Sequence, residues 1–421
     1  MPARPAPLLA LGAALALALA PAPTAAAPAD AAAPDRVLLT PTATPDTART
    51  LTWRSAPTPT PLLQIAPAHD PHDITEVAGT TTATLSGRAH HTATATGLAP
   101  GTEHRYRVGD GTAFGPWHTF TTTAGTDDPF TFLYFGDIQN DITDGAAPVV
   151  RAALDTEPDA ALALHAGDLI DSADNDAQWS EWFDAFGTRT ATLDHLAAPG
   201  NHEYSATSLS ARWTPQFPGN GTGPTTGRDL PDTVHTTDYQ GVRFIVLNSN
   251  YRNAAPLNTT AWLDTQRRWL QEALQDNPHD WTVVTFHHPL FSNSPGRDNA
   301  PLRTAWLDTL EEHDADLVLQ GHDHSYARGN LTANDTADPD VHTGPVYAVS
   351  VTGPKMYDVS PGNWTANGAR PRVQLDRTQT FQTVRVDGDT LHYTARTADG
   401  TVVDAFTIDK DGTGKTVTDT R

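Results

Sequence analysis

Five short segments of this chain carry side chains that bind metal ions through oxygen or imidazole nitrogen. They are Gly136-Asp137-Ile138-Gln139, Gly167-Asp168-Leu169-Ile170-Asp171, Gly200-Asn201-His202-Glu203, His287-His288-Pro289 and Gly321-His322-Asp323-His324. Carboxylates bridge two cations, while neutral imidazoles and an amide oxygen complete each coordination shell. The residue types therefore predict two neighbouring divalent metal ions, a pair that suits the hydrolysis of a phosphate ester.

Most of these segments follow an apolar run that predicts a buried strand. Residues 130–135 precede the first segment and residues 160–165 precede the second. Because ligands of open α/β sheets lie at the carboxyl ends of the strands, we expect Asp137 and Asp168 to lie side by side there. The same reasoning leads us to expect all five segments at one end of a sheet.

The elements that must position these segments alternate between strand and helix beyond a polar hinge at residues 121–128. The predicted strands are Phe130–Phe135, Ala160–His165, Val242–Asn248, Trp281–His287 and Ala315–Gln320, and the helices are Ala146–Thr156, Ala177–Phe186, Thr260–Gln275 and Leu302–His313. Such alternation predicts a central sheet flanked by helices. Four later strands are expected to form a second sheet: Val346–Val351, Phe381–Val386, Thr390–Thr397 and Val402–Ile408. We assign residues 129–409 to this α/β domain, with two central sheets flanked by helices.

Residues 35–124 are predicted to form a separate β-sandwich. They are rich in Thr, Ala and Pro, with short alternating runs and turns at Pro100-Gly101 and Gly109-Asp110-Gly111. The stretch from Leu98 to Val108 resembles a late-strand signature of fibronectin type III domains, in which an aromatic residue follows a Pro-Gly turn. We expect no chemistry in this domain.

Composition limits the classes of partner. The formal charge of −23 argues against nucleic acid or an anionic membrane, since both attract positive surfaces. The expected partner is a small phosphorylated substrate, drawn in by metal ions or local cations, and the oligomeric state is left open. The chain has no cysteine, which excludes disulfides, thiolate nucleophiles and cysteine-metal sites.

The first 27 residues are typical of a secretory signal peptide. Arg4 is followed by an apolar core from Leu8 to Ala20 and by small residues at Thr24 to Ala27. Pro21 and Pro23 end the apolar run, which is too short to span a bilayer comfortably. The sequence therefore predicts a secreted, extracellular protein.

The five segments, in this order, resemble the motifs of the calcineurin-like metallophosphoesterase superfamily. The resemblance extends from about Phe130 to Ile408, and with a fibronectin-like domain ahead of it the arrangement is similar to secreted purple acid phosphatases. It implies a phosphoric ester hydrolase with two metal ions, divalent or mixed-valence, drawn from Fe, Mn or Zn.

The resemblance also implies a role for each matching residue. Asp168 would bridge both metals, and Asp137 and His324 would complete the first site. Asn201, His287 and His322 would bind the second metal. The family pattern His-x-Pro selects His287 over His288, so we expect His288 to play a structural part beside the site.

This chain departs from the family pattern at two positions. Much of the superfamily has Asp-x-His where this chain has Asp137-Ile138-Gln139, so the first metal gains at best an amide oxygen and ligation by Gln139 stays open. Purple acid phosphatases carry a tyrosine at the position of Asp171, and its phenolate on iron(III) gives them their colour. We therefore expect a colourless protein.

The aspartate at position 171 instead resembles the protein-phosphatase branch, in which it orients the histidine of Gly-Asn-His. A carboxylate behind His202 favours the imidazolium, which makes His202 a candidate general acid. The implied reaction is attack by a metal-bound hydroxide on a phosphate monoester, with His202 protonating the leaving group. A phosphodiesterase or nucleotidase using the same site is the nearest alternative.

Other hypotheses remain beside this one. The chain could be a non-catalytic binding protein with a relic phosphatase domain, or a hydrolase with one metal in which Gln139 marks an emptied first site. Tyr251 and Arg252 follow a predicted strand, and Tyr326 and Arg328 follow the last motif. The sequence does not separate substrate contact from packing for these four residues, although an arginine there could clamp a phosphate.

Overall fold

The computed structural model describes residues 1–2, 33–125, 128–412 and 414–421 of the chain. The secretory signal predicted for residues 1–27 falls on residues outside this description, apart from the first two. No helix in the described part of the chain is long and apolar enough to cross a membrane. The described residues from position 33 onward form one compact unit.

The first strands of this unit form a β-sandwich, as their alternating pattern predicts. One layer contains β1 (Asp35–Pro41), β2 (Ala48–Ser55), β6 (Arg88–Thr96) and β5 (Thr80–Leu85), and the other contains β4 (Thr75–Ala78), β3 (Leu62–Pro67), β7 (Glu103–Gly109) and β8 (His118–Thr121). Leu51 and Trp53 from the first layer are buried against Leu63, Tyr106 and Val108 from the second. The sandwich therefore has its own apolar core.

A shared sheet joins this sandwich to the rest of the unit. β1 pairs in parallel with β11 (Asp194–Ala197), which places Leu39 opposite Asp194. Arg49 Nε lies 3.3 Å from Asp194 Oδ1, and both side chains are buried. The Tyr106 hydroxyl donates to the Ala191 carbonyl at 2.6 Å. The sandwich thus supports the strand that leads into Gly200-Asn201-His202.

Two sheets pack face to face in the α/β part. The larger has twelve strands in the order β19-β25-β24-β23-β22-β9-β10-β11-β1-β2-β6-β5, and the smaller has seven in the order β14-β15-β16-β17-β20-β18-β21. Their remaining strands are β9 (Phe130–Phe135), β10 (Leu162–His165), β14 (His235–Tyr239), β15 (Val242–Val246), β16 (Trp281–Thr285), β17 (Leu317–Gln320), β18 (Tyr326–Leu331), β19 (Val341–His342), β20 (Val346–Val349), β21 (Ala369–Leu375), β22 (Phe381–Asp387), β23 (Thr390–Arg396), β24 (Val402–Lys410) and β25 (Lys415–Asp419). Phe132 and Leu164 of the larger sheet share one buried cluster with Phe244 and Val283 of the smaller.

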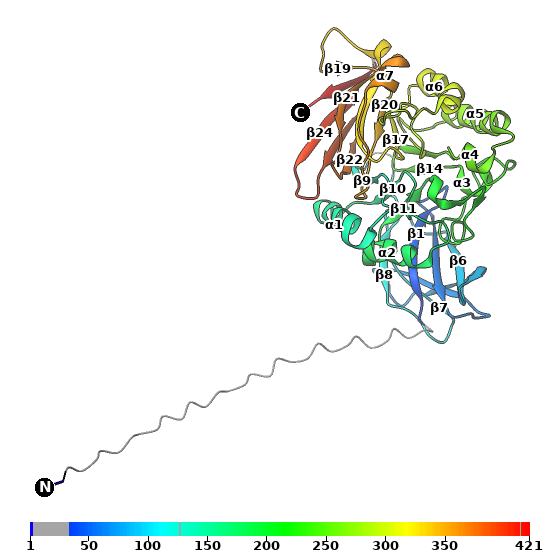
Figure 1. Ribbon diagram of the computed structural model, residues 1–421. Helices are drawn as coiled ribbons and strands as arrows, with labels where there is room; N and C mark the ends of the chain where they lie inside the picture. The colour runs from blue at the N-terminus through cyan, green and yellow to red at the C-terminus, as the bar shows by residue number, and fades with distance from the viewer. Residues whose placement is uncertain (3–32, 126–127, 413) are drawn as a thin grey trace. The chain divides into compact units, whose positions relative to one another are not determined.

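Helices cover the outer faces of both sheets (Figure 1). They are α1 (Ala147–Thr156), α2 (Asp176–Phe186), α3 (Leu230–Thr233), α4 (Tyr251–Ala254), α5 (Thr259–Gln275), α6 (Ala300–Glu312) and α7 (Gly362–Ala366). Leu133 of β9 packs with Trp179 and Trp182 of α2, and Val284 of β16 packs with Trp306 of α6. Strands such as β9 and β16, which helices cover on the outer face, are buried on both faces, and their sequences are therefore nearly continuous apolar runs.

The predicted fold class is confirmed, a strand-rich sandwich followed by an α/β domain, but the sheet membership predicted for the late strands is wrong. β22 pairs with β9, and β23 and β24 extend the larger sheet from there. β20 pairs instead with β17 of the smaller sheet. An apolar strand pattern reports burial and leaves the pairing partner undefined, because pairing is settled by tertiary packing.

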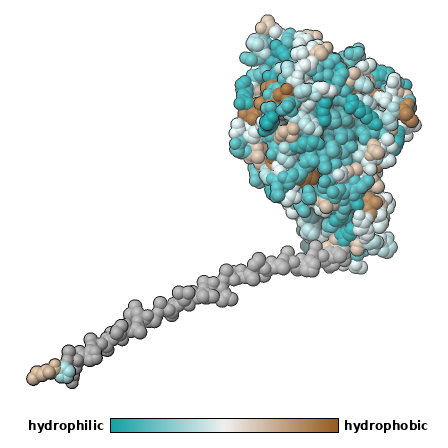
Figure 2. Space-filling view, in the orientation of Figure 1, coloured by the Kyte–Doolittle hydropathy of each residue, from teal (hydrophilic) through white to brown (hydrophobic). Residues whose placement is uncertain are grey.

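The surface agrees with the acidic composition. The face in Figure 2 is mainly hydrophilic, with apolar side chains scattered over it. Within residues 33–125, 128–412 and 414–421, the exposed large apolar side chains are Ile74 and Leu257. Single exposed apolar residues of this kind are ordinary for a folded protein surface.

Candidate metal centre

Three of the five predicted segments follow neighbouring parallel strands of the larger sheet. β10 pairs in parallel with β9 on one side and with β11 on the other. Asp137, Asp168 and Asn201 each follow the end of one of these strands by no more than four residues. The predicted placement of Asp137 beside Asp168 at the carboxyl edge of the sheet agrees with this geometry.

The other two segments come from the smaller sheet. His287 follows β16 and His322 follows β17, and these strands are also parallel neighbours. The backbone N–H groups of Thr352 and Gly353, just beyond β20, donate to the Asp137 carbonyl at 3.0 and 2.6 Å. The expectation of a single sheet end was therefore wrong: the segments meet where the carboxyl ends of two sheets come together.

The carboxylates and imidazoles form two clusters whose ligand atoms lie within 4.8 Å of one another. The first cluster is Asp137, Asp168 and His324, and the second is Asp168, His287 and His322. Asp168 belongs to both, which is the arrangement that a bridging carboxylate requires. His287, which the sequence favoured over His288, is the member of the pair that joins a cluster.

Two amide side chains lie at the same clusters. Asn201 Oδ1 is 3.2 Å from His287 Nε2 in the second cluster. In the first, Gln139 Nε2 donates to Asp168 Oδ2 at 2.9 Å and lies 3.0 Å from His324 Nε2. Gln139 therefore presents its nitrogen to the ligand atoms, and a half-turn of its amide is needed before Oε1 faces a cation.

Unsatisfied acceptors indicate that this donor set fits metal ions. Among the described residues, Asp137 Oδ2 and Gln139 Oε1 are buried atoms without a hydrogen-bond donor. Asp137 Oδ1 instead accepts the His322 N–H at 2.6 Å, and Asp168 Oδ1 accepts the His202 N–H at 2.8 Å. One oxygen of each carboxylate is anchored to the backbone, and Oδ2 of each is turned toward the histidines. Carboxylate, imidazole and amide donors suit Fe, Mn or Zn.

The close approach of these loops requires glycine at two positions. A Cβ on Gly200 would lie 2.1 Å from Asp168 Oδ1, and one on Gly321 would lie 2.3 Å from Asp137 Oδ1. Asp168, His322 and His324 adopt positive φ angles of 53°, 75° and 45°. Such conformations cost about 1–3 kcal/mol each and persist where the surrounding structure fixes them, as at functional sites.

Charges within the centre couple the protonation of its members. Burial alone would lower the pKa of His287, but Asp168 at 3.1 Å and Asp137 raise it to about 9. Burial alone would raise the pKa of Asp168, but His287 and His202 hold it below its usual range. A cation that binds the second cluster must therefore displace the proton of His287.

Glu203 has a structural role that the sequence did not assign. Its buried carboxylate accepts the backbone N–H groups of Gly200, Asp168 and Leu169 at 2.6, 2.9 and 2.8 Å. Burial and the nearby Asp168 raise the pKa of Glu203 to about 7. This side chain ties the second and third segments together. An acidic residue directly after Gly-Asn-His was the available signal.

His202 lies at the centre, but its contact with Asp171 differs from the expected one. His202 Nδ1 donates to the backbone carbonyl of Asp171 at 2.5 Å, while the Asp171 carboxylate is 3.6 Å away and accepts from Asn140 at 2.7 Å. His202 Nε2 lies 3.9 Å from Asp168 Oδ2. A carbonyl therefore fixes the ring, and Nε2 faces the shared carboxylate.

Three cations border the clusters. Arg297 Nη1 donates to the His322 carbonyl at 2.9 Å and lies 3.3 Å from Asp323 Oδ1. The Lys355 carbonyl lies 3.1 Å from His324 Nδ1. Arg252 donates to the Asp298 carbonyl at 3.2 Å and lies over the Tyr251 ring, and it contributes to the charge around His288. In an acidic chain, these side chains supply local positive charge beside the site.

Tyr326 and Arg328, which the sequence left open, belong to packing. Arg328 is buried and donates through Nε and Nη2 to Asp404 at 2.7 and 2.8 Å and through Nη1 to Asp419 at 2.7 Å. The Tyr326 hydroxyl donates to Asp404 at 2.7 Å. This buried network uses the groups that a phosphate would need, so neither side chain is available to substrate.

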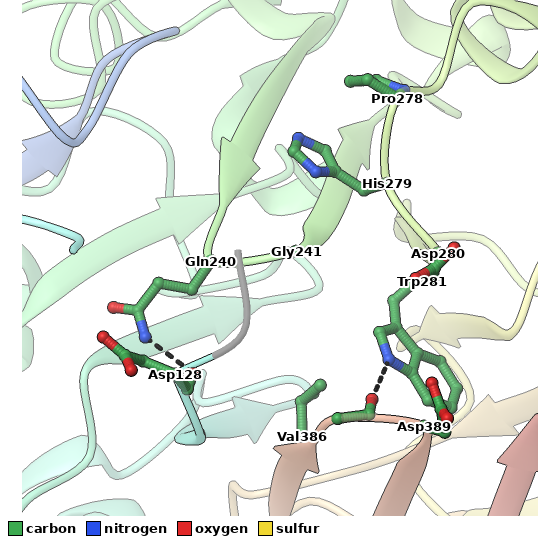
Figure 3. Close-up of a pocket in the computed structure, with 10 residues that line it drawn as sticks. Asp128, Gln240, Gly241, Pro278, His279, Asp280, Trp281, Val386 and Asp389 are labelled. Carbon is green, nitrogen blue, oxygen red and sulfur yellow. Dashed lines mark hydrogen bonds between the residues drawn. The ribbon is translucent and has the colours of Figure 1, made fainter. Parts of the chain in front are cut away.

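A pocket of about 160 Å³ lies at the opposite ends of the strands (Figure 3). It is bordered by Asp128 before β9, Gly241 before β15, and Asp280 and Trp281 at the start of β16. Gln240 donates to the Asp128 carbonyl at 2.9 Å, and Trp281 donates to the Gly388 carbonyl at 2.9 Å. Its acidic border would repel a phosphate, so this pocket does not compete with the metal clusters as the candidate site.

The fold and the clusters agree with matches to two family models. Residues 130–326 match the family model for calcineurin-like phosphoesterases, and residues 34–122 match that for the purple acid phosphatase N-terminal domain. The chain thus carries a region similar to calcineurin-like phosphoesterases, preceded by a region similar to the purple acid phosphatase N-terminal domain.

Individual relatives agree with this assignment. Purple acid phosphatase 21 of Arabidopsis thaliana is 26% identical over 62% of this chain and 57% of its own length. An uncharacterised protein of Mycobacterium tuberculosis is 29% identical over 36% of this chain and 31% of its own length. The matched regions thus span about a third to somewhat more than half of these relatives.

Solved structures show the same fold. Purple acid phosphatase PPD1 from yellow lupin seeds superposes with a TM-score of 0.74 and 18% identity, covering 90% of this chain and 75% of its own. The structure of PhoD gives a TM-score of 0.65 at 14% identity, covering 91% of each chain. At this identity the likeness concerns the fold alone.

Proposed function

We propose that this protein is a secreted phosphatase with two metal ions that hydrolyses phosphate monoesters. The observation that carries the proposal is the sharing of Asp168 between two clusters of buried ligands. We further propose residues 35–124 as the supporting sandwich and residues 129–409 as the catalytic domain, after a signal peptide at residues 1–27.

In this proposal, Asp137 and His324 hold the first metal, Asn201, His287 and His322 hold the second, and Asp168 bridges them. Gln139 joins the first site when its amide turns. Two such cations would activate a water molecule and neutralise the phosphoryl oxygens. Iron, manganese and zinc all suit these donors. Asp171 stands at the position where purple acid phosphatases carry a tyrosine ligand.

His202 is proposed as the general acid. Its Nδ1 is engaged with the Asp171 carbonyl, so Nε2 is the nitrogen that can deliver a proton to the leaving oxygen. The Asp171 carboxylate lies 3.6 Å from the same nitrogen, on the side of the ring away from Nε2. Asp171 thus positions His202 through its carbonyl.

Local cations support an anionic substrate. The chain carries a net charge of −23, which would repel phosphate at a distance. Arg252, Arg297 and Lys355 place positive charge beside the clusters, where it acts at short range. We propose that a small phosphorylated molecule binds between these cations and the metals.

Metal analysis combined with paired substrates tests this function. The purified protein should contain up to two transition metal ions per chain, and chelation should abolish turnover that Fe, Mn or Zn restores. A chromogenic phosphate monoester should be turned over faster than the matching diester. A faster diester would establish a phosphodiesterase, and a metal-loaded protein without either turnover would contradict the hydrolase proposal.

A further inference from the structure

Ser249 and His288 form a buried pair beside the second cluster. His288 is 3% exposed, and its ring centroid lies 4.2 Å from that of His322 and 5.0 Å from that of His287. Ser249 follows β15 and is fully buried. Its Oγ accepts the His288 backbone N–H at 2.8 Å and lies 3.0 Å from His288 Nδ1. A residue from the adjacent strand therefore holds both the backbone and the ring of His288.

The Ser249 hydroxyl determines which His288 nitrogen carries the proton. Within the described part of the chain, the hydrogen bonds of Ser249 Oγ are those to the His288 backbone and ring. Since Oγ already accepts the backbone N–H, its own proton has His288 Nδ1 as its acceptor. A buried hydroxyl without an acceptor would be costly. Nδ1 is therefore the accepting nitrogen, and Nε2 carries the N–H of the neutral ring.

The other ring nitrogen of His288, Nε2, belongs to a ring that packs against the metal ligands His287 and His322. It makes no hydrogen bond to a described residue, yet it is absent from the fully enclosed polar atoms that have no partner. It therefore reaches solvent. Four neighbouring groups contribute charge around the ring: Asp168, His287, Arg252 and Arg297. An anion attracted to the second cluster by these arginines would therefore bind beside this ring.

We propose that His288 donates its Nε2–H to a phosphoryl oxygen of the substrate, and that Ser249 is the positioning residue that fixes this tautomer. The inference rests on the proposed phosphatase function and names a residue that binds its substrate. Because Nδ1 is held as an acceptor, this donor needs no imidazolium, in contrast to His202. A fixed donor aimed at phosphoryl charge stabilises the transition state without reorganisation.

Nitrogen-15 NMR of histidine-labelled protein tests the tautomer without turnover. His288 should show a protonated Nε2 and an unprotonated Nδ1 in the wild type, and a mixture of tautomers in Ser249→Ala. The buried Ser210, which donates to the Ala173 carbonyl at 2.7 Å, gives the matched control Ser210→Ala. A protonated Nδ1 in the wild type would overturn the proposal.

Inorganic phosphate binding and ester kinetics test the role of the N–H. In metal-loaded protein, His288→Leu should weaken phosphate binding about 10-fold and lower kcat/KM about 100-fold, and Ser249→Ala should lower kcat/KM about 10-fold. His288→Gln, which retains a donor, should recover part of both losses. Equal losses in His288→Gln and His288→Leu would contradict donation by this side chain.

Metal content separates this role from ligation and from the proposed function. Both His288 variants should hold as much metal as the wild type, and loss of one metal would identify His288 as a ligand and overturn the proposal. If the loaded wild type turned over no ester, the phosphatase proposal would fail. The phosphate-binding difference between His288→Leu and His288→Gln would then still decide whether the N–H contacts a phosphoryl oxygen.

Discussion

The two metal clusters share Asp168 but differ in the other side chains that complete them. The second cluster adds two histidines and lies beside the Asn201 amide oxygen. The first adds Asp137 and His324, and the amide nitrogen of Gln139 donates into it. An N–H group binds no cation, so the first site must reorganise before it is filled. Gln139 therefore makes the two sites unequal, while the shared Asp168 carboxylate keeps them coupled.

Removal of the shared carboxylate breaks both clusters and should give the largest effect. Asp168→Asn replaces the bridging charge with a neutral amide, so we expect loss of metal from both sites and a fall in kcat of at least about 10³-fold. Metal analysis and monoester turnover measure this. Asp184→Asn on α2 is an exposed control. Retention of both metals with normal turnover would disprove the bridging role.

Loss of the His202 side chain should slow ester hydrolysis by an amount that depends on the leaving group. This effect should not depend on which metal site binds its metal more weakly. His202→Ala should slow esters with poor leaving groups about 10²-fold, since general acid catalysis contributes in that range, and good leaving groups much less. The dependence of kcat/KM on leaving-group pKa reports the difference. If both kinds of ester lost activity equally, His202 would have another role.

The second cluster should bind metal more tightly as pH rises. The pKa of His287 is about 9, above its ordinary 6.5, because Asp168 and Asp137 favour its charged form against the effect of burial. Metal must displace this proton, so affinity should rise by up to about tenfold per pH unit below pH 9. Titration of the metal-free protein with Zn²⁺ in buffers of different ionisation enthalpy would count the protons. Uptake without proton release would contradict this assignment.

The proton on His287 gives the folding stability of the metal-free protein a pH dependence opposite to that of metal affinity. A pKa raised in the folded state stabilises the fold fully below about pH 6.5, and this contribution is lost as pH rises toward 9. The contribution of His287 to the stability of the metal-free protein should therefore fall between about pH 6.5 and 9. Denaturant midpoints with and without metal would show the two trends diverging.

A histidine at position 139 should make the metal affinities of the two sites more alike, and we expect this change to give the smallest effect. Gln139→His replaces the donating amide with an imidazole nitrogen and should raise the affinity of the first site about 10-fold. Competition with a chelator measures the change, and Gln275→His at the exposed end of α5 is the control. Unchanged affinity would mean that the Gln139 amide already turns its oxygen to the metal at little cost.

Much of the fold could be predicted because the strands and helices are strongly patterned. The expected strand Phe130–Phe135 coincides with β9, and the helix expected at residues 177–186 agrees with α2 to within one residue. β11 was missed, since Asp194-His195-Leu196-Ala197 contains no run of apolar residues. Its burial depends on β1 and on Arg49, which lie far away in the sequence.

The candidate ligands could be predicted because aspartate, histidine and amide side chains are recognisable as metal ligands from residue type alone. All seven predicted ligands lie in or beside the two clusters, because the motifs place them directly after strands. The sequence did not anticipate that Glu203 clamps three backbone amides or that Asp171 reaches His202 through its carbonyl. Contacts made to or by the backbone depend little on which side chain a residue carries, so no sequence motif predicts them.

The sequence by itself predicted the ligand set, the glutamine at position 139 as a departure from the resembled pattern, and the α/β class, because these follow from residue type and short-range pattern. Only the tertiary structure decided that the ligands converge from two sheets, that Arg328 turns to Asp404 instead of substrate, and that Ser249 orients His288. Each of these depends on contacts between strands distant in sequence. Such contacts are set by packing of the whole chain, which local pattern does not encode.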